Sequence, residues 1–408
     1  MKEGRSCKDC CGLTCLNHSI SSNLTLPQGL EDVFLLIMAS KVQDIISIHP
    51  DPPASPNESV DHLLIFHITG NPGLASYYTT FLTLLYSQLQ DLSVPKTGKR
   101  RPIQTHIYSP SLAGFEVNTR PPESLARLRG APPYNLVAQI DHIDLALGRA
   151  VDEVEALKRP NSAIKVVLTG HSVGTFILLE VLRRRMERAQ KGQRSNAEIV
   201  GAILLFPTIM DLAKSPRGRK FWWLLVVPRS VLVLAAAAKL LTFWIPFSWM
   251  LALVQTVLGM PVEAATTTAS FVKSAMGVTQ ALYLAKNELD VITTDMWDDE
   301  VWGVEKAKGK SKRAKMFFYF GENDHWVANK TRDDLIAARA SKGLAGDGDK
   351  PVMEIDKQGV GHDFCIRRST VLLSRPLLIL RRTKRACRAE SGRVCTTDGP
   401  DELEVMIL

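Results

Sequence analysis

The stretch Val166–Gly174 reads VVLTGHSVG and joins a strand-like run to a serine flanked by glycines. The residues from Ile164 to Leu168 are mostly apolar and β-branched, which indicates a buried strand. Gly170 to Gly174 fits the pattern G-x-S-x-G, in which a serine occupies a sharp turn and the positions two residues away on each side must be small. Thr175 to Met186 has the apolar pattern of a helix packed on a sheet. The stretch therefore predicts strand, tight turn and helix, with Ser172 at the turn.

Ser172 is a candidate nucleophile, because a G-x-S-x-G turn between a strand and a helix raises the hydroxyl above the sheet of α/β-hydrolases. The alternative interpretation is an ordinary tight turn, since short glycine and serine patterns also occur by chance. The start of the helix directs backbone N–H groups toward the place where an oxyanion would form. We interpret His171 as a packing residue, because adjacent side chains at such a turn point in different directions.

Strand-like and helix-like segments alternate along most of the chain. This alternation predicts the α/β-hydrolase fold, an α/β architecture with a mostly parallel, twisted sheet and helices on both faces. The expected strands are His62–Ile68, Gln104–Tyr108, Ile164–Leu168, Ile199–Phe206, Met316–Phe320 and Val352–Ile355. The expected helices are Tyr77–Gln90, Leu136–Leu157, Thr175–Met186, Val262–Asn287 and Lys330–Ala340, and Ile366–Leu380 is expected to close the core.

A serine hydroxyl reacts only when a base takes its proton and a carboxylate orients that base. In this fold the chain order is serine, acid, histidine. His362 follows the last expected strand in a glycine-containing loop, and Asp324 follows the strand before it. We therefore predict that Ser172, Asp324 and His362 form a catalytic triad. The second choice for the acid lies in residues 290–299, although no strand precedes that region.

The first expected strand ends in Thr69-Gly70-Asn71-Pro72-Gly73, a turn that could supply backbone N–H groups opposite the serine. Proline has no N–H, so the donor must come from Asn71 or its neighbours. We predict that the Asn71 and Val173 N–H groups form the oxyanion hole. A plain turn is the alternative interpretation.

An apolar insertion is expected at about residues 212–300. From Phe221 to Met260 only two residues are charged, and residues 240–260 are long enough to cross a bilayer. Prolines interrupt the segment, so a re-entrant hairpin or a pair of interfacial helices fits better than one straight span. The alternative is a lid folded over the active site with its apolar face inward. The residues expected to contact lipid are Trp222, Trp223, Trp244, Phe247 and Trp249.

Composition and charge describe an ordinary globular chain with an uneven basic excess. Its 408 residues are 45% hydrophobic and 23% charged, with a net charge of +8. Basic clusters lie at residues 183–194, 306–315 and 375–388. No nucleic-acid module accompanies them, so no nucleic-acid partner is expected, and either an anionic lipid surface or solvated faces would explain them.

The seven cysteines lie mostly near the two ends of the chain, which favours a reducing compartment over a disulfide framework. Those at positions 7, 10, 11 and 15 could bind zinc or carry acyl chains, but no paired histidines or second cysteine pair supports zinc. We expect a flexible cysteine-containing segment over residues 1–57, a hydrolase domain over 58–380 and a basic flexible tail over 381–408.

Several of these motifs together resemble the lipid droplet-associated hydrolase family. The resemblance runs from about Asp61 to Ser374, and it rests on Gly70–Gly73 with Tyr77-Tyr78, Gly170–Gly174, Phe206-Pro207-Thr208 with Ser215-Pro216, Gly321–Trp326, and Gly361-His362 with Phe364-Cys365. It implies the same Ser172, Asp324 and His362 assignments and residence on lipid droplets and the cytosolic face of the endoplasmic reticulum membrane. Asp363 stands where a small residue is more usual. Its carboxylate would raise the pKa of the base, His362.

The resulting expectation is a serine hydrolase that cleaves lipid esters, either sterol esters or acylglycerols, through an acyl-enzyme and without a cofactor or metal. The alternative is a droplet-surface protein with a hydrolase scaffold and little turnover, acting in lipid storage or droplet organisation. A weaker alternative is thioester or peptide cleavage on the same fold.

Overall fold

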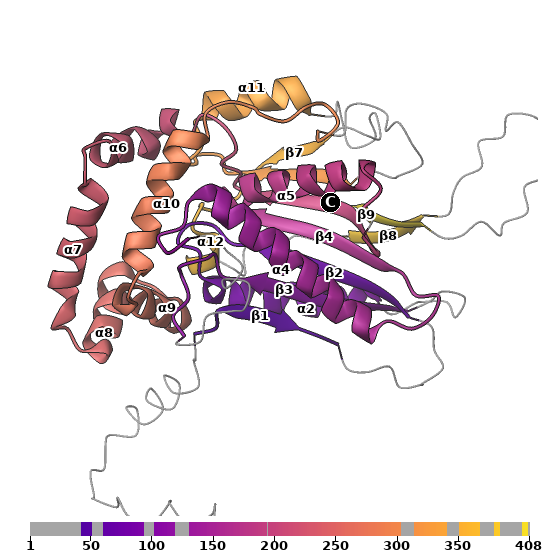
Figure 1. Cartoon of the computed structure of the whole chain (residues 1–408), viewed down its shortest axis with the longest axis horizontal. Coiled ribbons are helices and arrows are strands. Elements are labelled where there is room, and N and C mark those ends of the chain that lie inside the picture. Colours follow the sequence, from indigo (N-terminus) through magenta and orange to yellow (C-terminus); the bar gives the residue numbers. More distant parts are fainter. Residues whose placement is uncertain are drawn as a thin grey trace, which may run out of the picture. The chain divides into compact units, whose positions relative to one another are not determined.

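The computed structural model describes residues 42–50, 60–93, 102–118, 130–193, 195–302, 314–340 and 351–367, together with two short strands at 379–383 and 402–406 (Figure 1). The predictions for the N-terminal cysteines, for most of the basic clusters at 306–315 and 375–388, and for residues 368–378 lie outside the described residues.

A seven-stranded sheet forms the centre of the molecule, in the order β1-β3-β2-β4-β5-β6-β7. All neighbouring strands are parallel except β1, which pairs antiparallel with β3 at the edge. The strands are β1 (Ile45–Ile48), β2 (Asp61–Ile68), β3 (Ile103–Pro110), β4 (Ile164–His171), β5 (Ala197–Leu205), β6 (Lys315–Phe320) and β7 (Val352–Ile355). The inner strands are buried on both faces, which explains why they read as continuous apolar runs in the sequence.

Helices connect the parallel strands. The elements are η1 (Ala75–Tyr78), α2 (Thr79–Ser93), α4 (Leu136–Leu157), α5 (Val173–Gln190), α11 (Asn329–Arg339) and α12 (Phe364–Arg367). Helices α4 and α5 run side by side across the sheet face turned toward the viewer in Figure 1. The Asn135 side chain caps α4 by accepting a hydrogen bond from the Ala138 N–H. The elbow helix α5 is four residues longer at its C-terminal end than the pattern predicts.

Between β5 and β6 the chain leaves the sheet and forms a helical insertion, which occupies the left side of Figure 1. It consists of η2 (Leu212–Lys214), α6 (Pro216–Leu225), α7 (Ser230–Phe243), α8 (Phe247–Leu258), α9 (Val262–Lys273) and α10 (Gly277–Val291). Ser215 caps α6 by accepting from the Gly218 N–H. The insertion begins at the carboxyl end of the sheet, where loops of α/β folds form their binding sites.

The structure differs from the sequence-based prediction at one helix, and it describes strands in the two terminal segments. The expected helix at 262–287 is two helices, because Ser274 adopts an extended backbone and its Oγ accepts from the Gly277 N–H at 3.0 Å. Strand β1 lies inside the N-terminal segment expected to be flexible. In the expected flexible tail, β8 (Ile379–Thr383) pairs antiparallel with β9 (Glu402–Met406).

The basic cluster at 183–194 lies on α5, and its described arginines are ion-paired. Arg183 bonds to Glu180 and Glu187, Arg184 bonds to Asp141, and Arg185 and Arg188 both bond to Asp144 on α4. These pairs neutralise much of the local charge. Of the two interpretations of this cluster, the structure favours a solvated helix face over a lipid-binding patch.

Candidate functional site

Ser172 lies between β4 and α5 with a backbone φ of 53° and ψ of −127°. A side-chain-bearing residue with positive φ is strained, and such strain persists only where the surroundings enforce it. Here the Ser172 N–H donates to the Leu205 carbonyl of β5 at 3.1 Å, which ties the turn to the neighbouring strand. The G-x-S-x-G segment therefore forms the sharp strand-to-helix turn that its pattern predicts.

The glycines of the motif are required by close backbone contacts. A Cβ at Gly174 would lie 2.4 Å from the Ile68 carbonyl oxygen, and a Cβ at Gly170 would lie 2.7 Å from the Gly174 oxygen. Both distances are far below van der Waals contact. Only glycine at these positions lets the turn approach the end of β2.

Ser172, His362 and Asp324 form one hydrogen-bonded chain. The distance from His362 Nε2 to Ser172 Oγ is 2.9 Å, and the distance from His362 Nδ1 to Asp324 Oδ2 is 2.8 Å. Asp324 follows β6 and is buried, and its Oδ1 accepts from the Trp326 N–H at 2.8 Å. The carboxylate can only accept, so His362 Nδ1 carries a hydrogen and Nε2 is the acceptor for the serine hydroxyl. The three residues singled out from the sequence thus meet at the carboxyl ends of β4, β6 and β7.

Other acidic residues of the second-choice region and of the loop that carries His362 are engaged elsewhere. Asp295, in the second-choice region, bonds to the Trp302 indole and to Arg339. Asp356, fully buried at the end of β7, accepts the Val360 N–H at 2.7 Å and so shapes the loop that carries His362. The exposed Asp363 carboxylate pairs with Arg367 on its own helical turn at 2.9 Å.

His171 does more than the packing role expected from the sequence. Its Nε2 donates to the His362 carbonyl at 2.9 Å, and since a carbonyl only accepts, Nδ1 accepts from the Tyr78 hydroxyl at 2.7 Å. The Tyr78 oxygen in turn accepts from the Gly70 N–H at 2.9 Å. Burial, with the nearby His362, holds the pKa of His171 well below its usual value, so this imidazole stays neutral and is unsuited to act as the base.

The proposed oxyanion donors lie on either side of Ser172. Val173 is the first residue of α5, where a backbone N–H has no acceptor within the helix. Asn71 lies in the turn after β2, and its side-chain Nδ2 donates to the Ala281 carbonyl at 3.0 Å and to Glu288 Oε1 at 2.9 Å. The turn is therefore fastened to helix α10 of the insertion.

A cavity of about 270 Å³ opens beside Ser172 and His362. The sheet domain contributes polar residues to its wall, and η2, α6 and α10 contribute mainly apolar ones. Residues of this wall that the sequence analysis did not single out are Leu212, Arg217, Phe221, Ala285, Glu288 and Leu289, whereas Thr208 and Trp326 belong to motifs quoted there without an assigned role. No single pattern could have identified them, because they come from separate loops and helices that meet only in the fold. The insertion thus forms part of the cavity wall beside the nucleophile.

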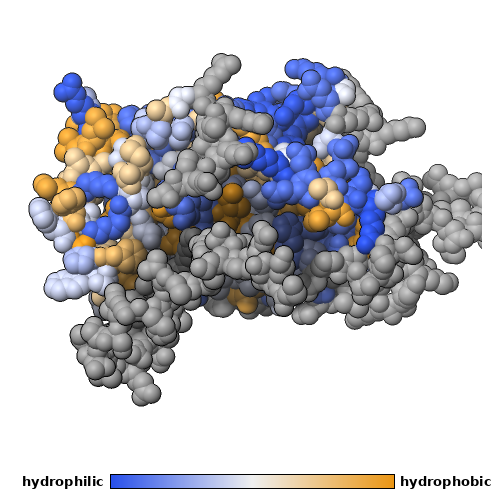
Figure 2. Space-filling view, turned by 60° about the horizontal axis from the view of Figure 1, so that its bottom comes forward, coloured by the Kyte–Doolittle hydropathy of each residue, from blue (hydrophilic) through white to orange (hydrophobic). Residues whose placement is uncertain are grey.

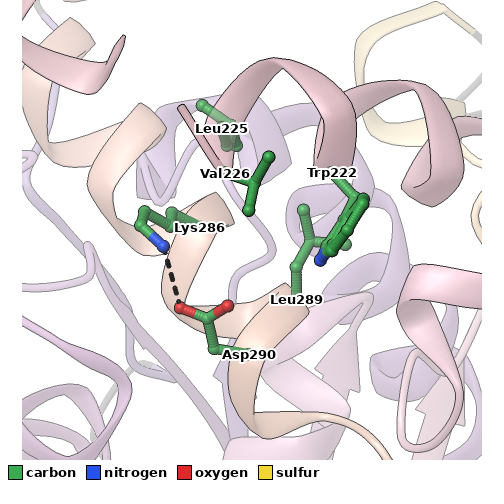
Figure 3. Close-up of a pocket in the computed structure, with 6 residues that line it drawn as sticks. All are labelled: Trp222, Leu225, Val226, Lys286, Leu289 and Asp290. Carbon is green, nitrogen blue, oxygen red and sulfur yellow. Dashed lines mark hydrogen bonds and ion pairs between the residues drawn. The ribbon is translucent and has the colours of Figure 1, made fainter. Parts of the chain in front are cut away.

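A second hollow, between α6 and α10, is too small for a ligand. Figure 3 shows Trp222 and Leu225 of α6, and Val226 just after it, facing Leu289 of α10, with Lys286 paired to Asp290. Its volume of about 10 Å³ is on the order of one water molecule. Leu289 lines both hollows, so the contact between α6 and α10 lies directly behind the wall of the cavity beside Ser172.

The outer face of α6–α8 exposes many large apolar side chains. Trp244 is 80% exposed, Trp249 73% and Trp223 71%, and Trp222 and Phe247 are also exposed. Figure 2 shows hydrophobic residues gathered at this end of the molecule. Further exposed members that the sequence analysis did not name are Leu232, Val233, Leu240, Leu241, Phe243 and Val257. Large contiguous apolar patches on a surface mark a contact with another protein or with lipid.

No single helix among the described residues is both long and apolar enough to cross a membrane. The pair α6 and α7 passes the same test of length and composition when taken together, but it bends by 93°. Residues 240–260 are divided between α7 and α8 at Pro246, so the straight span considered for this stretch is absent.

A scan of protein families matches residues 61–365 to the family described as lipid-droplet associated hydrolase. The lipid droplet-associated hydrolase of Gallus gallus is 28% identical over 284 residues, which cover 68% of this chain and 75% of that protein. The protein of the same description from Drosophila melanogaster is 24% identical and covers 75% of this chain and 85% of its own length.

Among solved structures, a peroxisomal α/β-hydrolase from Saccharomyces cerevisiae is similar over 81% of this chain and 85% of its own, with 13% identity and a TM-score of 0.46. A haloalkane dehalogenase from Bradyrhizobium elkani is similar over 79% and 92%, with 13% identity and a TM-score of 0.42. The family match extends over well more than half of the sequence. The chain therefore belongs to the lipid-droplet associated hydrolase family and has the α/β-hydrolase fold.

Proposed function

We propose that this chain is a serine hydrolase that cleaves carboxylic esters of lipids, sterol esters or acylglycerols, where lipid meets water. The observation that carries the proposal is the hydrogen-bonded chain from Ser172 through His362 to Asp324. It lies beside a cavity whose wall is formed in part by the insertion, and the outer face of this insertion is apolar.

In the proposed reaction, Ser172 Oγ attacks the acyl carbonyl carbon while His362 Nε2 takes the hydroxyl proton. The Asp324 carboxylate orients the imidazole and stabilises its positive charge. The Val173 and Asn71 N–H groups stabilise the oxyanion, and losing one such donor typically costs roughly 3 kcal/mol in the transition state. The alcohol then leaves with the proton held by His362.

The acyl group remains esterified to Ser172 after the first half of the reaction. His362 next deprotonates a water molecule, which attacks the acyl carbon and releases the fatty acid, and the proton returns to Ser172 Oγ. Apart from the substrate and this water molecule, these steps use side-chain and backbone groups of this chain. No cofactor or metal takes part in them.

We place the protein on lipid droplets and on the cytosolic face of the endoplasmic reticulum membrane. The names of the relatives support the droplet, and the exposed apolar face of α6–α8 supports contact with a lipid surface. Tryptophans such as Trp244 and Trp249 suit an interface, because one end of the indole is apolar and its N–H is polar.

The test is hydrolysis of a lipid ester by the wild type and by Ser172→Ala. We expect the variant to lose on the order of 10⁴-fold or more in kcat and to lose labelling by a fluorophosphonate probe. Ser195→Ala, at an exposed position just before β5, is the matched control and should behave as the wild type. Equal hydrolysis by wild type and Ser172→Ala would refute the proposal.

A second candidate function is organisation of the droplet surface with little turnover. The exposed apolar face favours it, because lipid binding by α6–α8 does not require Ser172. In that case Ser172→Ala keeps the effect of the wild type on stored lipid in cells, and deletion of residues 221–260 abolishes it.

A further inference from the structure

The cavity beside Ser172 contains polar groups that the triad does not use. Most of the insertion's contribution is apolar, through Leu212, Phe221 and Leu289. Three wall residues near the insertion differ from this pattern: Arg217 of α6, Glu288 of α10 and Thr208 after β5; of these, Glu288 and Thr208 have polar atoms without a partner among the described residues. They come from different parts of the fold and line the same small space as the nucleophile.

Glu288 is almost completely buried, and one of its two carboxyl oxygens makes no hydrogen bond to the described residues. Its Oε1 accepts from Asn71 Nδ2 at 2.9 Å, and its Oε2 has no hydrogen-bond partner among the described residues. Burial raises the pKa of Glu288 to about 8, against one opposing hydrogen bond from Asn71. At neutral pH the side chain is therefore a neutral acid with an O–H that it can donate. The ionisable groups facing the same cavity are His171, His362, Asp363, Arg217, Tyr77, Tyr78 and Cys365.

Thr208 is 3% exposed, and its Oγ1 finds no hydrogen-bond partner in the described part of the chain. A buried hydroxyl is normally paired, so an unpaired one at the wall of a binding cavity needs an explanation. A wholly apolar ligand would leave both Thr208 and the free oxygen of Glu288 without a partner. Ligand hydroxyl groups, which both donate and accept, would supply the missing partners in this cavity.

We propose that Glu288 and Thr208 form a subsite for a free hydroxyl group of the substrate. This inference rests on the proposed esterase function and narrows its substrate class to carboxylic esters that carry a hydroxyl near the ester bond, such as partial acylglycerols. Sterol esters have no such hydroxyl. A site built to bind a hydroxyl discriminates strongly against the analogue that lacks it, because the polar groups of the site are then left unpaired.

The test compares glyceryl monobutyrate with propyl butyrate, which has the same acyl group and no hydroxyl. We expect the wild type to favour the glyceryl ester in kcat/KM by at least about tenfold, equivalent to about 1.4 kcal/mol. Thr208→Val, nearly the same shape, should lower this ratio several-fold. Glu288→Met should also lower it, whereas Glu288→Gln should largely retain it, because the amide can still accept from Asn71 and donate to the ligand. Thr294→Val, an exposed threonine between α10 and β6, is the matched control.

A binding measurement separates failure of this inference from failure of the proposed function. Trp326 lines the cavity, so its fluorescence can report binding of two non-hydrolysable ethers, glyceryl butyl ether and propyl butyl ether. A preference for the glyceryl ether that Thr208→Val reduces would support the subsite even if no ester is cleaved. The subsite proposal would be overturned if the wild type had the same kcat/KM for the two esters and the same affinity for the two ethers. The proposal would also be overturned if Thr208→Val and Glu288→Met weakened the binding of the glyceryl ether and of the propyl ether equally. That result would indicate that the two residues have a structural role only.

Discussion

At the scale of single residues, His171 connects two parts of the site that are far apart in sequence. Through Tyr78 it reaches the Gly70 N–H beside the proposed oxyanion turn, and through its Nε2 it holds the carbonyl of His362. The ring also lies within an aromatic cluster with Phe206 and Phe364. We infer that His171 positions the base in addition to filling space.

His171→Phe should lower kcat for ester hydrolysis about fivefold with little change in KM. The reason is that the His362 carbonyl loses its donor, and one hydrogen bond contributes about 1 kcal/mol net. Tyr78→Phe removes only the hydroxyl and should have a smaller effect in the same direction. Steady-state kinetics over a range of pH checks this, and the profile should keep its shape, because His362 remains the base.

Phe81→Leu is the packing control for this prediction. Phe81 contacts Phe364 of the same aromatic cluster at 5.3 Å between ring centroids and bonds to none of these groups through its side chain. If Phe81→Leu and His171→Phe lower Tm and kcat alike, His171 only packs, and the positioning role is wrong.

At the scale of elements, the insertion turns its apolar side chains in two directions. Leu225, Met250 and Leu251 point inward and are buried, whereas the neighbouring Trp223 and Trp249 are exposed. A lid that only covered the active site would not need the outer set. The two interpretations considered from the sequence, lid and lipid contact, are therefore compatible, and the lipid contact remains a proposal.

Replacing both Trp244 and Trp249 by serine should reduce binding to triacylglycerol droplets by tenfold or more. Full burial of one large apolar side chain contributes about 1.5–3 kcal/mol. Partial insertion of two tryptophans into the lipid surface therefore accounts for a tenfold change in binding. Flotation of purified protein with artificial droplets measures the bound fraction. The fold should be preserved, because both side chains lie outside the core.

Leu157→Ser is the matched control, because Leu157 is a large apolar residue 55% exposed at the end of α4. It should float like the wild type. Equal loss in the control, or full binding by the double tryptophan variant, would contradict the assignment of the α6–α8 face as the lipid contact.

At the scale of the whole molecule, the parallel sheet was largely predictable. Its inner strands are apolar runs, and the carboxyl ends of parallel strands converge on one edge, so motifs after β4, β6 and β7 had to meet. This convergence is why Ser172, Asp324 and His362 could be brought together from their order in the chain. The G-x-S-x-G turn was also predictable from its glycines, because the backbone contacts at these positions leave no room for a side chain.

Other features depend on tertiary contacts that local patterns do not contain. Strand β1 has only four residues, and its place at the sheet edge is set by pairing with β3. Glu288 lies on a helix whose pattern does not reveal which face meets Asn71. The break at Ser274 replaces one expected helix by two, because a serine cap and a following glycine end α9 in a sequence that is otherwise helix-forming.

Three buried histidines make the stability of the whole fold depend on pH. Burial lowers the pKa of His67 and of His106 to about 3 and that of His142 to about 4. His67 bonds to Thr169 across β2 and β4, and His106 contacts His62 across β2 and β3. All three are therefore neutral in the folded state near pH 7.

Because the folded pKa values lie below the unfolded value of about 6.5, the unfolded chain binds more protons once the pH falls below 6.5. The stability contributed by the neutral histidines is present above that pH and is lost as the pH falls toward 4. These three groups contribute up to about 4 kcal/mol per pH unit to the slope of the free energy of unfolding, and His171, whose pKa burial also lowers, adds to it. Urea unfolding between pH 7 and pH 4.5 measures it. His142→Gln should reduce the slope by up to about 1.4 kcal/mol per pH unit. The glutamine amide can still donate to the Ser111 carbonyl, which His142 Nε2 contacts at 3.0 Å, but it does not titrate. An unchanged slope in this variant would contradict the prediction, because it would mean that His142 is protonated in the folded protein as readily as in the unfolded chain.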